Sequence, residues 1–375
     1  MKILYHHRIA SKDGQYVHIN EIVSAMSLLG HEVHLVGPSV SENSDFGSDG
    51  GFVSKLKSML PKSVYEIAEL SYGFVIAAKL ISKIIKEKPD VIYERYNLYQ
   101  PVGVIISKLT NTPIILEVNA PLRDERIKFS NGLAFPVIAK KIEYFTWRMA
   151  NHVLPVTEVL AKHLVDANVE QKNITVIHNG IKKSGLAKGK EIKQNGEIVV
   201  GFVGFMHLTC GVEWAIDVIA ATRNKKIKLI CVGDGDVVDS LKEKAKMLGL
   251  SSQIQFTGLV DRSEVMQYVS KFDIALQPDV TEYASPLKMF EYMLSKCLIL
   301  APKKKNIYEI LSKSEAVFFD SGEYGFKKAL EYAFSNFDEL QPKREAAFRK
   351  LEKSGFTWED NVEKIVEIAE REINK

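Results

Sequence analysis

Short apolar runs alternate with amphipathic helical patterns along almost the whole chain. In the first half, strands are predicted at Lys2–Tyr5, Glu32–Val36, Val91–Tyr93, Pro113–Val118, His152–Pro155 and Thr175–Ile177. In the second half, they are predicted at Ile198–Val203, Lys228–Val232, Ile254–Phe256, Ile274–Leu276, Leu298–Leu300 and Ala316–Phe319. The spacing of apolar residues predicts helices at Val17–Leu29, Val64–Lys86, Phe135–Met149, Leu340–Ser354 and Trp358–Ile373.

This alternation predicts an α/β protein with two doubly wound domains. Strands separated by helices form parallel sheets that are covered on both faces, and a chain of 375 residues exceeds what one core usually holds. The stretch Lys182–Gly196 is rich in Lys and Gly and poor in apolar residues, so it is the predicted linker. We therefore expect one domain over residues 1–181 and a second over residues 197–356.

Composition and charge narrow the class of protein. The chain is 46% hydrophobic and 26% charged with a net charge of +3, which is ordinary for a globular protein and gives no electrostatic footprint for nucleic acid. The three cysteines are far apart, which favours reduced thiols in the cytoplasm over a disulfide framework or a zinc site. No signal peptide or membrane span of ~18 apolar residues is evident. The segment Lys55–Lys88 mixes apolar residues with lysines, so it is either a core-facing helix with an exposed lysine face or a contact with an anionic membrane.

The strongest chemical signal is the segment Ser285–Glu291, which follows the predicted strand Ile274–Leu276. Ser is a favoured N-cap and Pro fits the first helical position, so a helix is predicted to begin at Pro286. Its first turn offers unpaired N–H groups to a phosphate, and Lys288 adds a positive charge there. Glu291 lies on the same face, where a carboxylate could bind ribose hydroxyls. The segment predicts a nucleotide-diphosphate site; the alternative is a capped helix with a Lys–Glu surface pair.

Other candidate residues also follow predicted strands. Gly14 opens the first helix, but no Gly-x-Gly-x-x-Gly pattern is present, which disfavours a nicotinamide dinucleotide. Gly204 ends one strand, and Gly258 follows another where its backbone could face a base. Glu117 and Asn119 end a third strand, where they could bind sugar hydroxyls, and a solvated loop with local ion pairs explains the charged run Arg123–Arg126 that follows equally well. Ligands of parallel sheets bind beyond the carboxyl ends of the strands, so these loops are predicted to line a cleft between the domains.

Taken in order, these pieces resemble the family 4 glycosyltransferases, which are retaining enzymes of the two-domain GT-B fold. The resemblance runs nearly end to end, and it depends on the collinear order of motifs that are individually weak. The motifs are Gly14–His18, Leu29–Val33, Val153–Thr157, Val176–Ile181, Gly201–Gly211, Val232–Gly235, Phe256–Val260, Ser285–Met293 and Phe356–Glu359.

The resemblance implies two Rossmann-like domains that face each other across a cleft, with residues 357–375 crossing back to the first domain. A nucleotide-diphosphate sugar would be the donor, with neither metal nor cofactor, and the acceptor would be a glycan or lipid-linked glycan. The implied donor contacts are Gly14, Gly204, His207, Gly258, Leu259, Tyr283, Ser285, Pro286, Leu287, Lys288 and Glu291. The implied acceptor contacts are His18, Glu117, Asn119, Arg123 and Glu125, and the implied catalytic residues are Lys288, Glu291 and Asn119.

The chain departs from the family pattern at several of these positions. Phe205 and Cys210 stand where family members commonly carry an Arg and a Lys for the phosphates, which leaves His207 as the nearest basic residue. The Glu-x7-Glu motif keeps its second glutamate, but Tyr283 replaces the first, and Asn119 replaces a histidine of the first domain. Two alternatives to a transferase therefore stay open. They are a non-catalytic partner that binds a glycan or another transferase, and a GT-B sugar-nucleotide epimerase.

Overall fold

The computed structural model describes residues 1–10, 14–38, 60–130, 132–186, 196–207 and 210–375. The chain divides into two compact units. Unit 1 comprises Met1–His178, Tyr283–Ser285 and Trp358–Lys375, and unit 2 comprises Asn179–Glu282 and Pro286–Thr357. Residue Asp13, residues 55–59 of the lysine-rich segment and residues 187–195 of the predicted linker lie outside the described residues.

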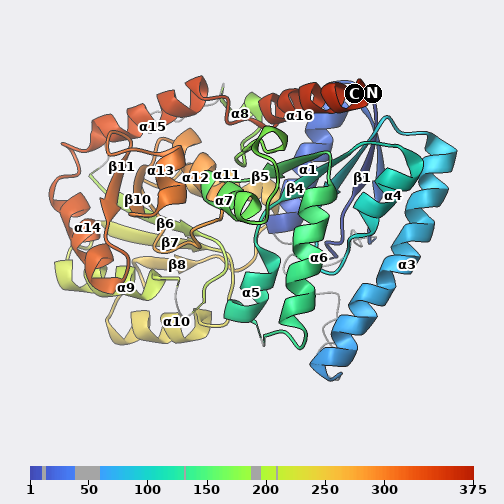
Figure 1. Ribbon diagram of the computed structural model, residues 1–375. Helices are drawn as coiled ribbons and strands as arrows, with labels where there is room; N and C mark the ends of the chain where they lie inside the picture. Colours follow the sequence, from blue (N-terminus) through green and yellow to red (C-terminus); the bar gives the residue numbers. More distant parts are fainter. Residues whose placement is uncertain (11–13, 39–59, 131, 187–195, 208–209) are drawn as a thin grey trace. The chain divides into compact units, whose positions relative to one another are not determined.

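Unit 1 is built on a five-stranded parallel sheet in the order β2-β1-β3-β4-β5 (Figure 1). Its strands are β1 (Lys2–His6), β2 (Glu32–Val36), β3 (Val91–Arg95), β4 (Ile114–Val118) and β5 (His152–Pro155). Its helices are α1 (Gly14–Leu28), α3 (Lys62–Glu87), α4 (Val102–Thr110), α5 (Leu122–Phe129), α6 (Pro136–Met149), α7 (Glu158–Asp166) and α16 (Trp358–Ile373), with a 3₁₀ turn, η1 (Gln171–Asn173).

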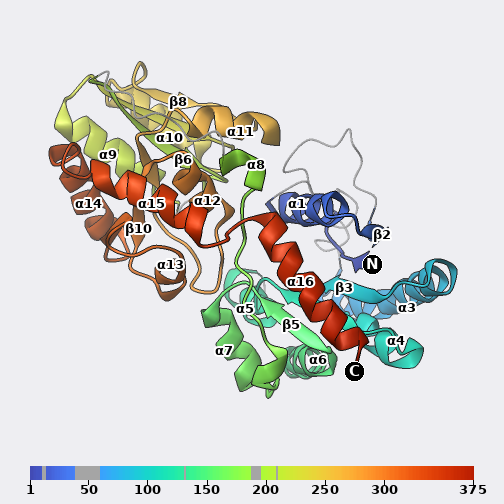
Figure 2. The ribbon, with the colours of Figure 1, turned by 90° about the horizontal axis from the view of Figure 1, so that it is seen from above.

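The sheet of unit 1 carries apolar side chains on both faces, as a buried parallel sheet requires. On one face, Ile92 and Leu116 pack with Leu80 of α3 and Trp147 of α6. α1 packs against the final helix, α16, as Figure 2 shows. The helix α3 is therefore core-facing along one side, as one of the two interpretations of this segment expects.

One predicted strand of unit 1 is wrong. Residues Thr175–Ile177 are not a strand, although the N–H of Thr175 donates to Val153 O at 3.1 Å and the N–H of Ile177 donates to Pro155 O at 3.0 Å. Beside β5 the described part of the chain records only an isolated bridge, between Val153 and Ile174, directly before this segment.

Unit 2 is built on a six-stranded parallel sheet in the order β11-β10-β9-β6-β7-β8. Its strands are β6 (Ile198–Val203), β7 (Ile227–Val232), β8 (Ile254–Phe256), β9 (Ile274–Leu276), β10 (Leu298–Pro302) and β11 (Ala316–Phe319). Its helices are α8 (Lys183–Leu186), α9 (Val212–Thr222), α10 (Val238–Met247), α11 (Arg262–Val269), α12 (Leu287–Leu294), α13 (Lys305–Ile310), α14 (Glu323–Ser335) and α15 (Gln341–Lys353).

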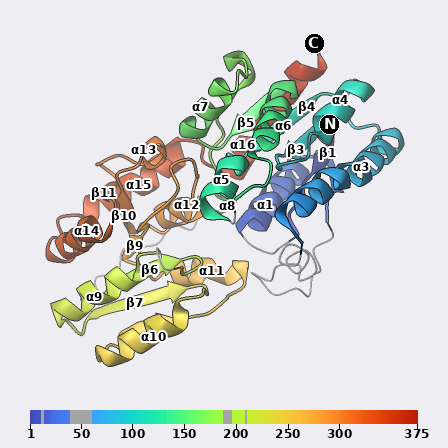
Figure 3. The same cartoon turned by 60° about the horizontal axis from the view of Figure 1, so that its bottom comes forward.

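Two apolar clusters hold the helices of unit 2 to its sheet. One cluster joins the strands to α9, α10 and α14, and the other joins them to α11, α12 and α15 (Figure 3). The predicted α/β class with two doubly wound sheets is thus confirmed. In each sheet the strand order reverses at one point, between β1 and β3 in unit 1 and between β6 and β9 in unit 2. Open α/β sheets bind ligands beyond the carboxyl ends of the strands at such points.

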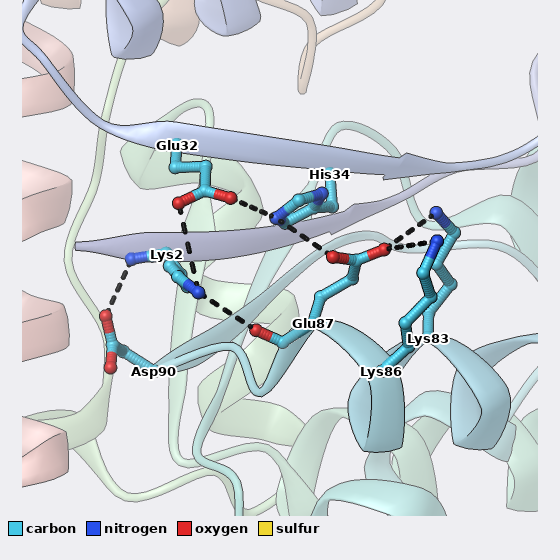
Figure 4. A network of polar contacts seen from close by, with 7 residues as sticks. All are labelled: Lys2, Glu32, His34, Lys83, Lys86, Glu87 and Asp90. Carbon is cyan, nitrogen blue, oxygen red and sulfur yellow. Dashed lines mark hydrogen bonds and ion pairs between the residues drawn. The ribbon is translucent and has the colours of Figure 1, made fainter.

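A polar network joins α3 to the opposite, amino-terminal edge of the first sheet (Figure 4). The N–H of Lys2 donates to Asp90 at 2.6 Å, and His34 lies 2.9 Å from Glu32 and 3.9 Å from Glu87. A shallow, open pocket of about 360 Å³ lies beside these residues. Because its charges pair with one another at the edge away from the strand carboxyl ends, we interpret the network as structural: it holds α3 to the sheet.

Across the described ranges, no helix has the length and apolar character that crossing a membrane requires.

Candidate functional site

Three glycine turns meet beyond the carboxyl ends of β6, β7 and β8. Gly204 follows β6 with φ +135°, and Gly233 follows β7 with φ +126°. A Cβ atom at Gly233 would lie 2.3 Å from the carbonyl oxygen of Gly204, so only glycine fits there. The N–H of Gly233 also donates to Gly258 O, after β8, at 3.1 Å. The three loops therefore form a continuous backbone surface at this edge of the sheet.

Helix α12 presents Lys288 to this surface. The helix begins at Leu287 with Pro286 as its cap (φ −71°, ψ 118°), so the prediction of Ser285 as the cap and Pro286 as the first helical residue is wrong by one position. The cause is that Pro286 keeps an extended ψ. Lys288 remains in the first turn, where its Nζ lies 4.5 Å from the centre of the Phe202 ring. A Cβ atom at Gly204 would lie 3.3 Å from that Nζ.

Burial changes the protonation of Lys288. Desolvation lowers its pKa from the ordinary value to about 8, against a smaller raising effect of Cys210 and Glu291. Burial disfavours the protonated form of this amine. A bound anion would stabilise the protonated form, so anion binding and protonation of Lys288 would favour each other. Lys288 stands in the first turn of α12, where a helix presents backbone N–H groups to an anion, although the N–H of Met289 already donates to Pro286 O at 3.1 Å.

Glu291, one turn further along α12, is 2% exposed and forms an ion pair with Arg262, the first residue of α11. The alternative of an exposed Lys–Glu surface pair on this helix is therefore wrong. Sequence reasoning missed Arg262, because it stands 29 positions before Glu291 and no local pattern links the two.

The loop after β6 offers little further positive charge among its described residues. Phe205 is 38% exposed, and Met206 is fully buried. His207 is exposed and pairs with Asp236 at 3.2 Å. Cys210 is half-buried, and burial raises the pKa of its thiol. Leu259, which is 41% exposed, is the neighbour of Gly258 on the base-facing turn predicted from the sequence.

A second set of polar residues lies in unit 1, within and next to the carboxyl-terminal halves of β1, β3 and β4. Arg95 NH1 donates to Glu117 at 2.6 Å and to Nδ1 of His18 at 2.9 Å. The hydroxyl of Tyr93 donates to Glu117 at 2.7 Å, and the amide nitrogen of Asn119 donates to the same carboxylate. Burial by itself would raise the pKa of Glu117, but His18, Arg95 and these hydrogen bonds outweigh it and hold the pKa below its ordinary value.

His18 is neutral at pH 7 in this arrangement. Burial lowers its pKa to about 4 and outweighs the raising effect of Glu117, and the positive charge of Arg95 adds a smaller lowering effect. The ring is stacked on Trp358 of α16, with centroids 5.0 Å apart. Beside it at the same sheet edge, His6 Nδ1 lies 2.6 Å from Glu94.

The other sequence-predicted residues of unit 1 lie apart from this set. Arg123 pairs with Asp124 at 3.2 Å. Glu125 accepts a hydrogen bond from the hydroxyl of Tyr283 at 2.8 Å, and Tyr283 belongs with Ser285 to unit 1. Gly14 is the first residue of α1, with open space around its Cα.

Sequence reasoning missed His6, Tyr93, Glu94 and Arg95. The available signal was the pair of adjacent charged residues Glu94 and Arg95, which directly follows the predicted strand Val91–Tyr93. Charged residues in a fully buried strand need partners of opposite charge. Among the described residues, no three His, Cys, Asp or Glu side chains are grouped so that they could hold a metal ion.

Two family models match the sequence. Residues 12–184 match the model described as Glycosyltransferase Family 4, and residues 197–336 match the model described as Glycosyl transferases group 1. No curated protein matches the chain.

Several solved structures share the fold. A structure of Anabaena HepE in complex with UDP is 18% identical with a TM-score of 0.73, over 99% of this chain and 100% of that one. A glycosyltransferase from Rickettsia africae is 17% identical with a TM-score of 0.72, over 99% and 98%. Sucrose-phosphate synthase from Thermosynechococcus elongatus is 12% identical with a TM-score of 0.76, over 99% and 98%. At these identities the likeness establishes the shared architecture.

Proposed function

Because this chain is a family 4-like glycosyltransferase of the GT-B fold, we propose that it transfers a sugar, with retention, from a nucleotide-diphosphate sugar to a glycan or lipid-linked glycan acceptor. Unit 2 holds the donor in this proposal. The observation that carries it is Lys288, a half-buried amine with a pKa of about 8 on the first turn of α12, beside Gly204.

Each donor contact follows from the chemistry of its residue. Lys288 and the N–H groups of α12 bind the diphosphate and stabilise the negative charge that develops as it leaves. This supplies the positive charge that a metal would otherwise provide, so we propose that the reaction is metal-independent. Glu291 accepts hydrogen bonds from the ribose hydroxyls, and the backbone at Gly258 faces the base. The complexes of HepE with UDP and UDP-glucose make uridine nucleotides the first probes to test.

In the proposed reaction, the acceptor oxygen bonds to the anomeric carbon on the face from which the diphosphate departs. The bond between that carbon and the diphosphate oxygen breaks, and the acceptor proton passes to the departing diphosphate. Asn119 contributes from unit 1, because its amide nitrogen donates to Glu117. Its carbonyl oxygen is therefore the atom that can accept a hydrogen bond from a sugar hydroxyl.

The test measures donor hydrolysis and glycosyl transfer with a panel of nucleotide sugars. Lys288→Ala and Glu291→Ala are expected to lower both rates at least tenfold, because a hydrogen bond to a charged group contributes about 1.5–3 kcal/mol. Lys246→Ala is the matched control, since Lys246 is an exposed lysine on α10 of the same unit. Rates unchanged in both site variants would refute the mechanism.

Phe205 and Cys210 favour a second candidate function, a non-catalytic protein that keeps the fold and binds a glycan or another transferase. Neither residue supplies the positive charge that a diphosphate needs in this loop. Calorimetry separates the two functions: millimolar or tighter binding of any nucleotide sugar supports the transferase, and no binding across the panel supports the partner.

We also propose that unit 1 contacts the cytoplasmic face of an anionic membrane through α3. Apolar side chains about two and about three helical turns apart are exposed along this helix, with Ile67 56%, Phe74 81% and Ile85 70% exposed. Such a stripe can enter the interface while the lysines of the same helix face anionic headgroups. Paired Phe74→Asp and Ile85→Asp substitutions are expected to abolish sedimentation with anionic vesicles. Met247→Asp, at an 81% exposed position of unit 2, is the control, and equal sedimentation of all variants would refute this contact.

A further inference from the structure

The ion pair between Arg262 and Glu291 joins two elements that the sheet topology brings to the same edge. Arg262 opens α11 after the turn that contains Gly258, and Glu291 lies on α12. The side chain of Glu291 is 3% exposed, whereas that of Arg262 is 37% exposed. The carboxylate is thus enclosed, and its partner reaches it from the surface of the donor loop.

The ion pair completes a ring of neighbouring residues at the proposed donor site. Gly204 adjoins Gly233 and Lys288, and Gly233 is hydrogen-bonded to Gly258. From Gly258 the chain leads within four residues to Arg262, which returns to α12 through Glu291. Backbone amides, an ammonium, a guanidinium and a carboxylate therefore surround one region of unit 2.

The chemistry of the pair assigns different roles to its two members. A buried carboxylate needs a partner, because an uncompensated charge in the interior is costly. A guanidinium has five N–H donors in a rigid plane, so binding one carboxylate oxygen fixes the direction of the other. Recognition of two adjacent ribose hydroxyls depends on that direction, since each hydrogen bond weakens steeply when misaligned.

We propose that Arg262 is a positioning residue that orients Glu291 toward the ribose and thereby sets the preference for ribonucleotides over deoxyribonucleotides. This inference rests on the proposed donor site. It identifies a residue that acts through Glu291 and does not itself need to touch the sugar.

The experiment compares the affinities of UDP and 2′-deoxy-UDP by calorimetry, after GDP and ADP have been tested as alternative bases. The wild-type chain is expected to bind the ribonucleotide roughly tenfold or more tightly, because one hydrogen bond to a charged group is lost with the 2′-hydroxyl. Arg262→Gln is expected to bring this ratio close to one. Arg349→Gln, at an exposed arginine of α15 in the same unit, is expected to leave the ratio unchanged.

The ratio distinguishes positioning from a general loss of structure, because a purely structural defect weakens both nucleotides equally. If Arg262→Gln does not fold, Arg262→Lys is measured instead. Lysine keeps the positive charge but lacks the planar guanidinium, so the ratio of the affinities for UDP and 2′-deoxy-UDP is expected to fall at least threefold. A wild-type ratio retained in the folded Arg262 variant would overturn this inference alone. A wild-type chain that binds no nucleotide would overturn the proposed function together with it.

Discussion

Raising the pH through 8 should weaken diphosphate binding by an amount that the environment of Lys288 determines. Burial places the pKa of this amine at about 8, so it is about nine-tenths protonated at pH 7 and about one-tenth protonated at pH 9. A diphosphate binds the protonated form, because only that form carries the charge. The apparent Kd should therefore rise about tenfold between pH 7 and pH 9.

Calorimetry with UDP can measure this dependence and the proton uptake that accompanies it. Near pH 8 the free amine is half protonated, so binding should take up about half a proton, which is seen when buffers of different ionisation enthalpy are compared. Lys288→Met should bind roughly 10–100-fold more weakly at pH 7 and show little change up to pH 9. A wild-type affinity that is constant over this range, or an equal pH dependence in the Met variant, would refute the reasoning.

Three further predictions concern the stability of the fold. Glu117→Gln should lower the free energy of unfolding by about 3–5 kcal/mol, because a buried guanidinium loses its counter-ion; urea denaturation measures this, and a loss below 1 kcal/mol would contradict it. Gly233→Ala should cost at least ~1–3 kcal/mol and weaken UDP binding, because its φ is +126° and the new methyl group would meet a backbone carbonyl; wild-type stability with wild-type affinity would count against the packed turns. Burial lowers the pKa values of His7, His18 and His152 to about 4, so their contribution to stability is present above about pH 6.5 and is lost as the pH falls toward 4; an unchanged urea midpoint between pH 7 and pH 5 would contradict this.

The pattern of apolar residues predicted most strands closely. The bounds of β2, β5, β6, β9 and β11 agree with the prediction. β9 and β11 are continuous apolar runs, as largely buried strands of a parallel sheet often are. β2 is an edge strand that carries Glu32 and His34 and is only partly buried. The same signal failed at Thr175–Ile177, where a short run with two apolar residues pairs with β5 through two backbone hydrogen bonds but is not a strand. The local sequence does not indicate where a neighbouring strand ends.

Candidate site residues could be predicted where they belong to a local sequence motif, and could not be predicted where they do not. The glycine turns follow strands closely, and Lys288 and Glu291 lie on a helix whose start is marked by Ser285 and Pro286, so both kinds of feature can be recognised in the sequence. The partners of these residues were not predictable. Arg262 and Arg95 are ordinary basic residues until the fold places each against a buried carboxylate that is distant in the chain.

The sequence by itself determined the class of fold, the alternation of strands and helices, and the helix turn that carries Lys288. Those features follow from short-range preferences, which act within about one turn of helix or one strand. The tertiary structure alone decided which charges are buried, which partners neutralise them and how far the pKa values of Lys288 and His18 fall. Desolvation and charge pairing depend on atoms brought together from distant parts of the chain, and only packing brings them together.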